Sequence, residues 1–171
     1  MAACAHISGL LATGAIVRLL EDGSVVLNTG AVDIGQGSDT VLTQICAEAL
    51  KIPVEQVSLA SPDTDGSPYN WGTTASRVTY TTGRSVVVAA QEVERQIKAH
   101  AADILECAAA DLELRPGGFV GLIGVPEKQL PFIAVSKRAH WRTGGPIVGA
   151  KTLVYDGPTI DPKRAVAIGL P

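Results

Sequence analysis

Apolar residues at helical spacing mark two segments of this chain. The first segment predicts a helix that begins near Ser38 or Asp39, either of which could cap its free amides. This helix is expected to end before Pro53, because proline cannot continue it. Its apolar positions fall on a single stripe that should face the core: Val41, Leu42, Ile45, Cys46, Ala49 and Leu50.

The second segment predicts a longer helix, from about Gly83 to Ala110. Glu94 and Lys98 are spaced i, i+4 on its polar side, where opposite charges attract each other. The buried stripe of this helix is expected to contain Val86, Ala90, Val93, Ile97, Ala101, Ile104, Leu105 and Ala108.

Sequence typical of β-strands surrounds these helices. His6 to Glu21 predicts extended chain with a break at Gly14, and Glu21 to Ser24 has the composition of a hairpin turn. The segment SVVLNT, from Ser24 to Thr29, is then the returning strand. We therefore expect a β-hairpin at the start of the domain.

The rest of the chain completes a mixed pattern. Other short elements are predicted as strands at 56–59, 119–123 and 147–155, a helix at 132–141 and a loop at 156–171. The predicted fold class is therefore α+β, in which two main helices pack on a mixed or antiparallel sheet.

Composition narrows the class of protein. The 171 residues are enough for one domain with an ample core, and a hydrophobic content of 46% excludes an intrinsically disordered chain. A net charge of −3 with only 4% aromatic residues argues against nucleic-acid binding through phosphate neutralisation or base stacking. Charged residues make up only 18%, which suggests that some faces are buried against other protein.

The cysteines and the N-terminal segment add exclusions. Cys4, Cys46 and Cys107 form no C-x-x-C pair, so neither a zinc nor an iron–sulfur site is expected. The apolar run from Ala2 to Val17 is too short for a membrane span and lacks the basic region of a signal peptide. These features favour a cytoplasmic protein, and both ends of the sequence are interpreted as cuts in a longer polypeptide.

The first candidate site is Gly35-Gln36-Gly37, at the start of the first helix. Two glycines let the backbone approach a ligand closely, and the helix start offers free N–H groups that suit an electron-rich ligand. Gln36 adds an amide that both donates and accepts. Taken alone, the segment is better explained as a turn before a capped helix than as a ligand site. Thr40 stands where a dinucleotide-binding G-x-G-x-x-G fingerprint needs glycine, so that class is disfavoured.

The second candidate site is Thr73 to Thr79 (TTASRVT), ahead of the long helix. Its hydroxyls, small side chains and amides could grip a polar ligand, or could simply cap the helix. Arg77 could meet a phosphate or carboxylate ligand, or a structural partner. Asp63 and Asp65 in the preceding loop are expected to form Asx turns rather than a catalytic pair.

Both candidate segments carry a family resemblance. DGSVVLNTGAVDIGQGSDTVLTQICAEAL and DTDGSPYNWGTTASRVTYTTG resemble the molybdenum-binding subunit of the xanthine dehydrogenase family. That family includes aldehyde oxidoreductases, carbon monoxide dehydrogenase and aryl-CoA hydroxylase/reductases. The resemblance covers about Val17 to Ala110, and more loosely the rest. The sequence from Pro68 to Gly72 is similar to that of the 4-hydroxybenzoyl-CoA reductase-like branch of the family.

The resemblance implies a molybdopterin cofactor, in the cytosine dinucleotide form, with Gln36 near the molybdenum centre. Iron–sulfur and flavin (FAD) centres would then lie on partner domains or subunits. The family's catalytic glutamate lies in a segment that this sequence does not match, so no catalytic residue and no metal ligand is expected here. The implied cofactor-binding residues are Gly35, Gln36, Gly37, Thr74, Ala75, Ser76, Arg77, Val78 and Thr79.

Two interpretations of the whole chain, residues 1–171, follow from these observations. In the first, the chain is a single molybdopterin-binding lobe of a longer subunit of a molybdenum oxidoreductase, and is inert alone. Its partners would be the rest of that subunit and iron–sulfur and flavin subunits, with neither nucleic acid nor membrane involved. In the alternative, the chain is a non-catalytic assembly domain that keeps the fold without the cofactor.

Overall fold

The central sheet is built on the predicted hairpin. A computed structural model of the protein describes residues 11–154, 160–161 and 166–167. In it, β1 (Thr13–Leu19) and β2 (Val25–Thr29) run antiparallel, with Val17 opposite Leu27. The expected extended chain from His6 begins outside the described residues. Gly14 lies inside β1 instead of breaking the strand.

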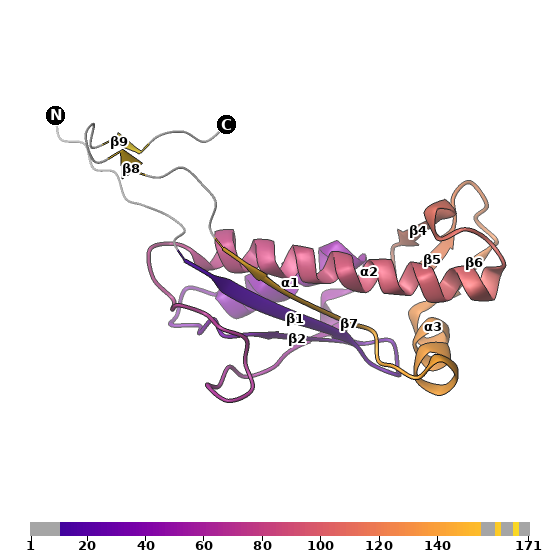
Figure 1. Ribbon diagram of the computed structural model, residues 1–171, viewed down its shortest axis with the longest axis horizontal. Helices are drawn as coiled ribbons and strands as arrows, with labels where there is room; N and C mark the ends of the chain where they lie inside the picture. The colour runs from indigo at the N-terminus through magenta and orange to yellow at the C-terminus, as the bar shows by residue number, and fades with distance from the viewer. Residues whose placement is uncertain (1–10, 155–159, 162–165, 168–171) are drawn as a thin grey trace.

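Two further strands extend this sheet on either side. β7 (Val148–Leu153) pairs antiparallel with β1, and β3 (Val57–Leu59) pairs parallel with β2. The strand order is β3-β2-β1-β7, which gives a mixed sheet (Figure 1). The short helical turn η1 (Val54–Gln56) leads into β3.

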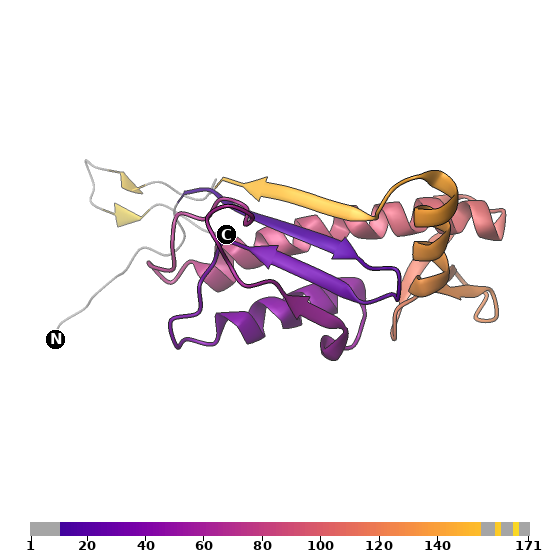
Figure 2. The ribbon, with the colours of Figure 1, turned by 90° about the horizontal axis from the view of Figure 1, so that it is seen from below.

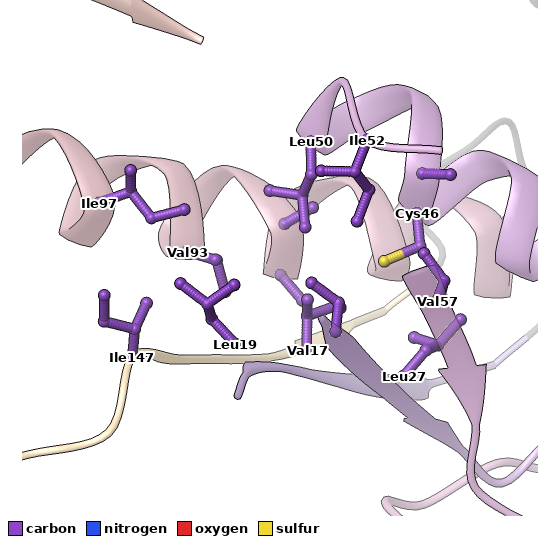
Figure 3. Packing of buried hydrophobic residues seen from close by; sticks show 14 of the residues in the cluster. Val17, Leu19, Leu27, Cys46, Leu50, Ile52, Val57, Val93, Ile97 and Ile147 are labelled. Carbon is purple, nitrogen blue, oxygen red and sulfur yellow. The ribbon is translucent and has the colours of Figure 1, made fainter. Parts of the chain in front are cut away.

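Both main helices cover one face of the sheet. α1 (Ser38–Leu50) and α2 (Gly83–Leu105) lie behind the strands in Figure 2. In β1, side chains on this face are fully buried at alternate positions, as the period of a strand requires. Figure 3 shows the core between the two layers, with Val17 and Leu27 of the sheet pointing toward Leu50 and Val93 of the helices. The α+β fold class, with two main helices on a mixed sheet, is therefore confirmed.

The long helix ends earlier than the sequence predicted. α2 ends at Leu105, because Glu106 adopts a left-handed conformation with φ of 53° and its N–H bonds to the carbonyl of Ala102. The chain then passes through η3 (Ala109–Asp111) into a strand. Ala108 is exposed and outside the helix, so its assignment to the buried stripe was wrong.

A second, smaller antiparallel sheet lies at the far end of α2 (Figure 1). It contains β4 (Leu112–Arg115), β5 (Phe119–Leu122) and β6 (Gln129–Pro131). Only β5 was predicted from the sequence. The predicted short helix follows as α3 (Phe132–Arg138), which η4 (Ala139–Thr143) continues.

The segment expected as a loop at 156–171 is described only in part. It contains a pair of two-residue strands, β8 (Ile160–Asp161) and β9 (Val166–Ala167), which pair with each other. The other residues of that expected loop lie outside the described residues. None of the helices in the described part of the chain combines the length and the apolar character needed to cross a membrane.

Candidate functional site

The loop that leads into α1 is organised around the carboxylate of Asp33. Its Oδ1 accepts hydrogen bonds from the N–H groups of Gly35 at 2.7 Å and Gly37 at 3.4 Å, and its Oδ2 from Asp39 N–H at 3.2 Å. The two glycines adopt left-handed conformations, with φ of 103° and 78°. These amide donors, led by Gly35 and then Asp39, lower the pKa of Asp33.

This arrangement corrects two expectations about the helix start. Gly37 is the N-cap residue and offers no side chain, so neither Ser38 nor Asp39 caps α1. The amides expected to receive an electron-rich ligand already donate to Asp33. The carboxylate of Asp33 therefore accepts the hydrogen bonds that a capping side chain or a ligand was expected to accept.

Gln36 is the polar group that this loop presents to solvent. Its Oε1 accepts a hydrogen bond from Ile34 N–H at 2.7 Å, and its Nε2 donates to Ser38 Oγ at 3.0 Å. A carboxamide has two N–H groups and two acceptor lone pairs, so one of each is left over from these two bonds. The side chain is thus held in place with one donor and one acceptor still available to a ligand.

The second candidate segment has an unusual backbone. Ala75 and Ser76 are both left-handed, with φ of 49°, although neither is glycine. Each such residue costs about 1–3 kcal/mol and persists only where its surroundings hold it. The segment then enters η2 (Val78–Thr82), a π-helical turn that runs directly into α2.

The two candidate segments lie side by side. Thr73 Oγ1 donates to Val32 O at 2.7 Å and lies 3.1 Å from Val32 N, which donates to it. Next to this contact is a cavity of about 340 Å³ whose wall includes Gln36 from the first segment. The cavity is lined by Ile34, Gln36, Thr73, Thr74, Ala75, Ser76, Arg77, Val78 and Thr79.

Most of the predicted site residues therefore share one cavity. Gly35 and Gly37 flank Gln36 without lining the cavity, and Cβ atoms built on them would meet nothing within 4 Å. Sequence reasoning missed Ile34, which is 71% exposed, and it included Thr73 without predicting that its hydroxyl bonds to Val32. An isoleucine directly before the Gly35-Gln36-Gly37 segment was the signal that could have identified the first.

Arg77 contributes to this site in a different way from its neighbours. Its side chain is fully buried, and its guanidinium donates to Asn70 Oδ1 and to backbone carbonyls, including that of Gly72. Burial lowers the pKa of Arg77. The structural alternative, with protein acceptors as the partners, is the one that this geometry supports.

The acidic loop before the second segment has a local role. Asp63 Oδ1 accepts hydrogen bonds from the N–H groups of Asp65 and Gly66, which confirms the expected Asx turn. Among the described residues, no three His, Cys, Asp or Glu side chains are grouped so that they could hold a metal ion. The side chains that line the cavity are instead amide, hydroxyl and apolar groups together with the buried Arg77, a set that suits a polar organic ligand.

Comparison with known proteins decides the family. Residues 1–166 match the sequence model of the molybdopterin cofactor-binding domain. The chain belongs to this family of molybdopterin cofactor-binding domains. The resemblance seen in the Gln36 and Ser76 segments is thereby confirmed.

Relatives of this molybdopterin cofactor-binding domain are parts of larger proteins. The chain is 38% identical over 123 residues to the putative xanthine dehydrogenase molybdenum-binding subunit XdhA of Escherichia coli K12, and 37% identical over 112 residues to the carbon monoxide dehydrogenase large chain of Afipia carboxidovorans. The alignments cover 71% and 66% of this chain, but only 16% and 14% of the relatives. The domain thus spans less than a fifth of the length of either relative.

A solved structure supports the fold of the domain. Quinoline 2-oxidoreductase from Pseudomonas putida 86 superposes with a TM-score of 0.77 at 29% identity. The match covers 85% of this chain and 19% of that protein chain.

The cavity fits the group that the family name implies. A pterin is a flat heterocycle with amide-like donors and acceptors on its edge, and it needs hydrogen-bonding partners when it leaves water. The wall supplies the free donor and acceptor of Gln36 and the hydroxyl groups of Thr74, Ser76 and Thr79. The residues present are therefore of the right chemistry to hold a molybdopterin.

Proposed function

We propose that this domain is the cofactor-binding lobe of a molybdenum-dependent oxidoreductase, and that the cavity between the Gln36 and Ser76 segments holds the pterin. The observation that carries the proposal is that two segments far apart in the sequence line one polar cavity. The hydrogen bonds between Thr73 and Val32 fix their relative position.

The proposed roles follow from where each residue lies. The remaining amide donor and acceptor of Gln36 would bind near the molybdenum centre, while Gly35 and Gly37 leave the space beside Gln36 open. The hydroxyl groups and backbone of Thr74, Ala75, Ser76, Val78 and Thr79 would bind the pterin. Arg77 would act from inside the protein, since its guanidinium faces protein acceptors.

The bound group would supply the redox chemistry, the oxidation of an electron-poor carbon in the substrate. This chain's own residues bind and orient that group, and we assign none of them a catalytic step. We propose aldehydes, N-heterocycles or aryl-CoA-type compounds as substrates of the whole enzyme. The names of relatives that act on xanthine and quinoline support the N-heterocycle class.

We further propose that the cofactor is the cytosine dinucleotide form, that iron–sulfur and FAD centres lie on partner subunits, and that the location is cytoplasmic. Relatives described as a molybdenum-binding subunit and a large chain support the multi-subunit arrangement. On this account the chain is one lobe of a longer molybdenum subunit and is inert alone.

The test is to purify the longest natural form of the protein and to measure molybdenum and released pterin per polypeptide. Near-equimolar pterin supports cofactor binding, whereas a folded protein without metal or pterin supports the non-catalytic assembly domain. Gln36→Ala should lower pterin content and turnover while the melting temperature stays nearly unchanged, because the side chain is exposed. A large loss of melting temperature with normal pterin content would instead assign Gln36 a structural role.

A further inference from the structure

The left-handed residues of the site need neighbouring groups that hold them in place. We call residues Thr73–Ser76 the strap; it contains the two left-handed residues Ala75 and Ser76 and forms much of the cavity wall. Left-handed conformations at non-glycine residues relax unless the surrounding structure over-determines them. A relaxed strap would move the groups that face the cavity.

Arg77 anchors the end of the strap. Its guanidinium donates to Asn70 Oδ1 and Gly72 O, each at 3.0 Å, and to the carbonyls of Leu11 and Ala12, each at 3.2 Å. These acceptors come from the segment before β1 and from the loop that precedes the strap. The planar five-donor fork of arginine can reach acceptors on several sides, which the three donors of a lysine on a flexible stem cannot reproduce.

Asn70 anchors the start of the strap. Its Nδ2 donates to the hydroxyls of Thr13 at 2.8 Å and Thr82 at 3.2 Å. Its Oδ1 accepts from Gly72 N–H at 2.8 Å as well as from Arg77. Both donors and both lone pairs of this one amide are therefore used, and they join β1, the loop and η2.

The two anchors form one connected network. Thr13 Oγ1 and Thr82 Oγ1 lie 3.1 Å apart, and Ser85 Oγ donates to Thr13 O at 3.0 Å. Thr13, Thr82 and Ser85 are all buried, so the network lies where water cannot replace a lost partner. Asn70 does not line the cavity, although it bonds to both sides of the strap.

We propose that Asn70 and Arg77 are positioning residues that lock the strap in the shape that receives the cofactor. The proposal rests on the proposed function, because it assigns a role within the same binding site. The lock acts before the cofactor arrives, so it should be measurable in cofactor-free protein. The effect of breaking the lock should also be specific to this network, and should not appear when an arginine elsewhere in the fold is replaced.

The test compares four variants of the longest natural form of the protein. Asn70→Leu and Arg77→Lys break the lock. Asn70→Asp keeps an acceptor for Gly72 N–H and Arg77, and the Thr13 and Thr82 hydroxyls can rotate to donate to it. Arg115→Lys is the matched control, because Arg115 donates to the carbonyl of Leu122 in β5 and to those of Val125 and Pro126 in the loop after it, far from the strap.

Two readouts separate positioning from stability. The first is hydrogen exchange of the strap amides in cofactor-free protein, and the second is retained pterin per polypeptide. We expect faster exchange at the strap and about tenfold weaker pterin retention in Asn70→Leu and Arg77→Lys, the scale for losing groups that orient ligands. Asn70→Asp should restore both readouts, and Arg115→Lys should change neither, even where it lowers the melting temperature.

Each outcome bears on one proposal. If the wild type retains pterin, and Asn70→Leu and Arg77→Lys retain as much as Arg115→Lys, the lock is refuted while the proposed function stands. If the wild type retains no pterin, the proposed function fails, and exchange at the strap still decides whether the lock exists. Should Asn70→Leu not fold, Arg77→Lys against Asn70→Asp makes the same comparison.

Discussion

At Gly149, strand β7 lies so close to helix α2 that no side chain fits between them, and we predict that Gly149→Ala destabilises the domain. A Cβ at this residue would overlap the carbonyl oxygen of Ala89, lie 3.0 Å from the carbonyl carbon of Ala89 and lie 3.1 Å from Val93 Cγ2. The Ala89 atoms belong to the backbone of α2 and cannot rotate away. Strand or helix must therefore shift.

The expected magnitude follows from this overlap. Overpacking in a dense core costs about 1–3 kcal/mol of the free energy of unfolding. For a domain of this size that corresponds to a fall of about 2–12 °C in melting temperature. The φ of Gly149 is outside the left-handed region, so the cost is steric and contains no backbone strain.

Gly145→Ala is the matched control. It lies just before the same strand, has no atom within 4 Å of its added Cβ, and is also outside the left-handed region. Both substitutions reduce the entropy of the unfolded chain equally, so this contribution cancels in the comparison. Thermal unfolding followed by circular dichroism measures both variants. Equal melting temperatures for Gly149→Ala and Gly145→Ala would refute the close packing of β7 on α2.

Three further predictions concern other parts of the fold. Because amide donors lower the pKa of Asp33, its carboxylate stabilises the loop above the ordinary carboxyl value of 3.8 and loses this effect as the pH falls through the lowered value. Asp33→Asn should therefore lose less melting temperature than the wild type between pH 7 and pH 2; equal losses would contradict this reasoning. Burial raises the pKa of Cys46 to about 12, so iodoacetamide at pH 8 should leave it unmodified in folded protein and label half-buried Cys107, as peptide masses will show. Leu50→Ala should lower the free energy of unfolding by about 2–5 kcal/mol in a denaturant titration, because Leu50 is fully buried; a loss below about 1 kcal/mol would mean that α1 does not pack there.

The presence of the two main helices was predicted correctly, because their apolar residues repeat with the period of a helix. The stripe of α1 gave its position, and most of the predicted stripe of α2 is buried, with Val86, Val93 and Ile97 fully so. Glu94 and Lys98 pair at 2.7 Å as their spacing suggests. Apolar and polar residues repeat there over several turns, which makes the signal long enough to interpret.

Short elements left too little pattern to detect. β4 has four residues and β6 has three, and β4 directly follows a long helical stripe. Leu112 and Leu114 alternate with polar residues, but two buried positions do not distinguish a strand from the tail of a helix. α2 ends at the left-handed conformation of Glu106, and because this residue is not glycine, the sequence contained no signal for the end of the helix.

At the site, the residue types indicated which kind of ligand could bind, but not which groups in the protein each residue would bond to. The two segments came from the sequence, yet the bridge from Thr73 to Val32 joins residues 41 positions apart. The acceptor that caps α1 is Asp33, because the loop turns back on itself through two left-handed glycines. Likewise, the inward direction of Arg77 depends on carbonyls from two other segments of the chain, at Leu11–Ala12 and at Gly72.

The central claim is that the Gln36 and Ser76 segments clasp one pterin. The most direct measurement is hydrogen–deuterium exchange of the longest natural form, with cofactor and without it after production in a host that cannot make molybdopterin. The account predicts that amides at 35–37 and at 74–79 become protected together when the cofactor is bound, while those at 119–131 in the second sheet stay unchanged. Protection of only one of the two segments, or of neither, would contradict it.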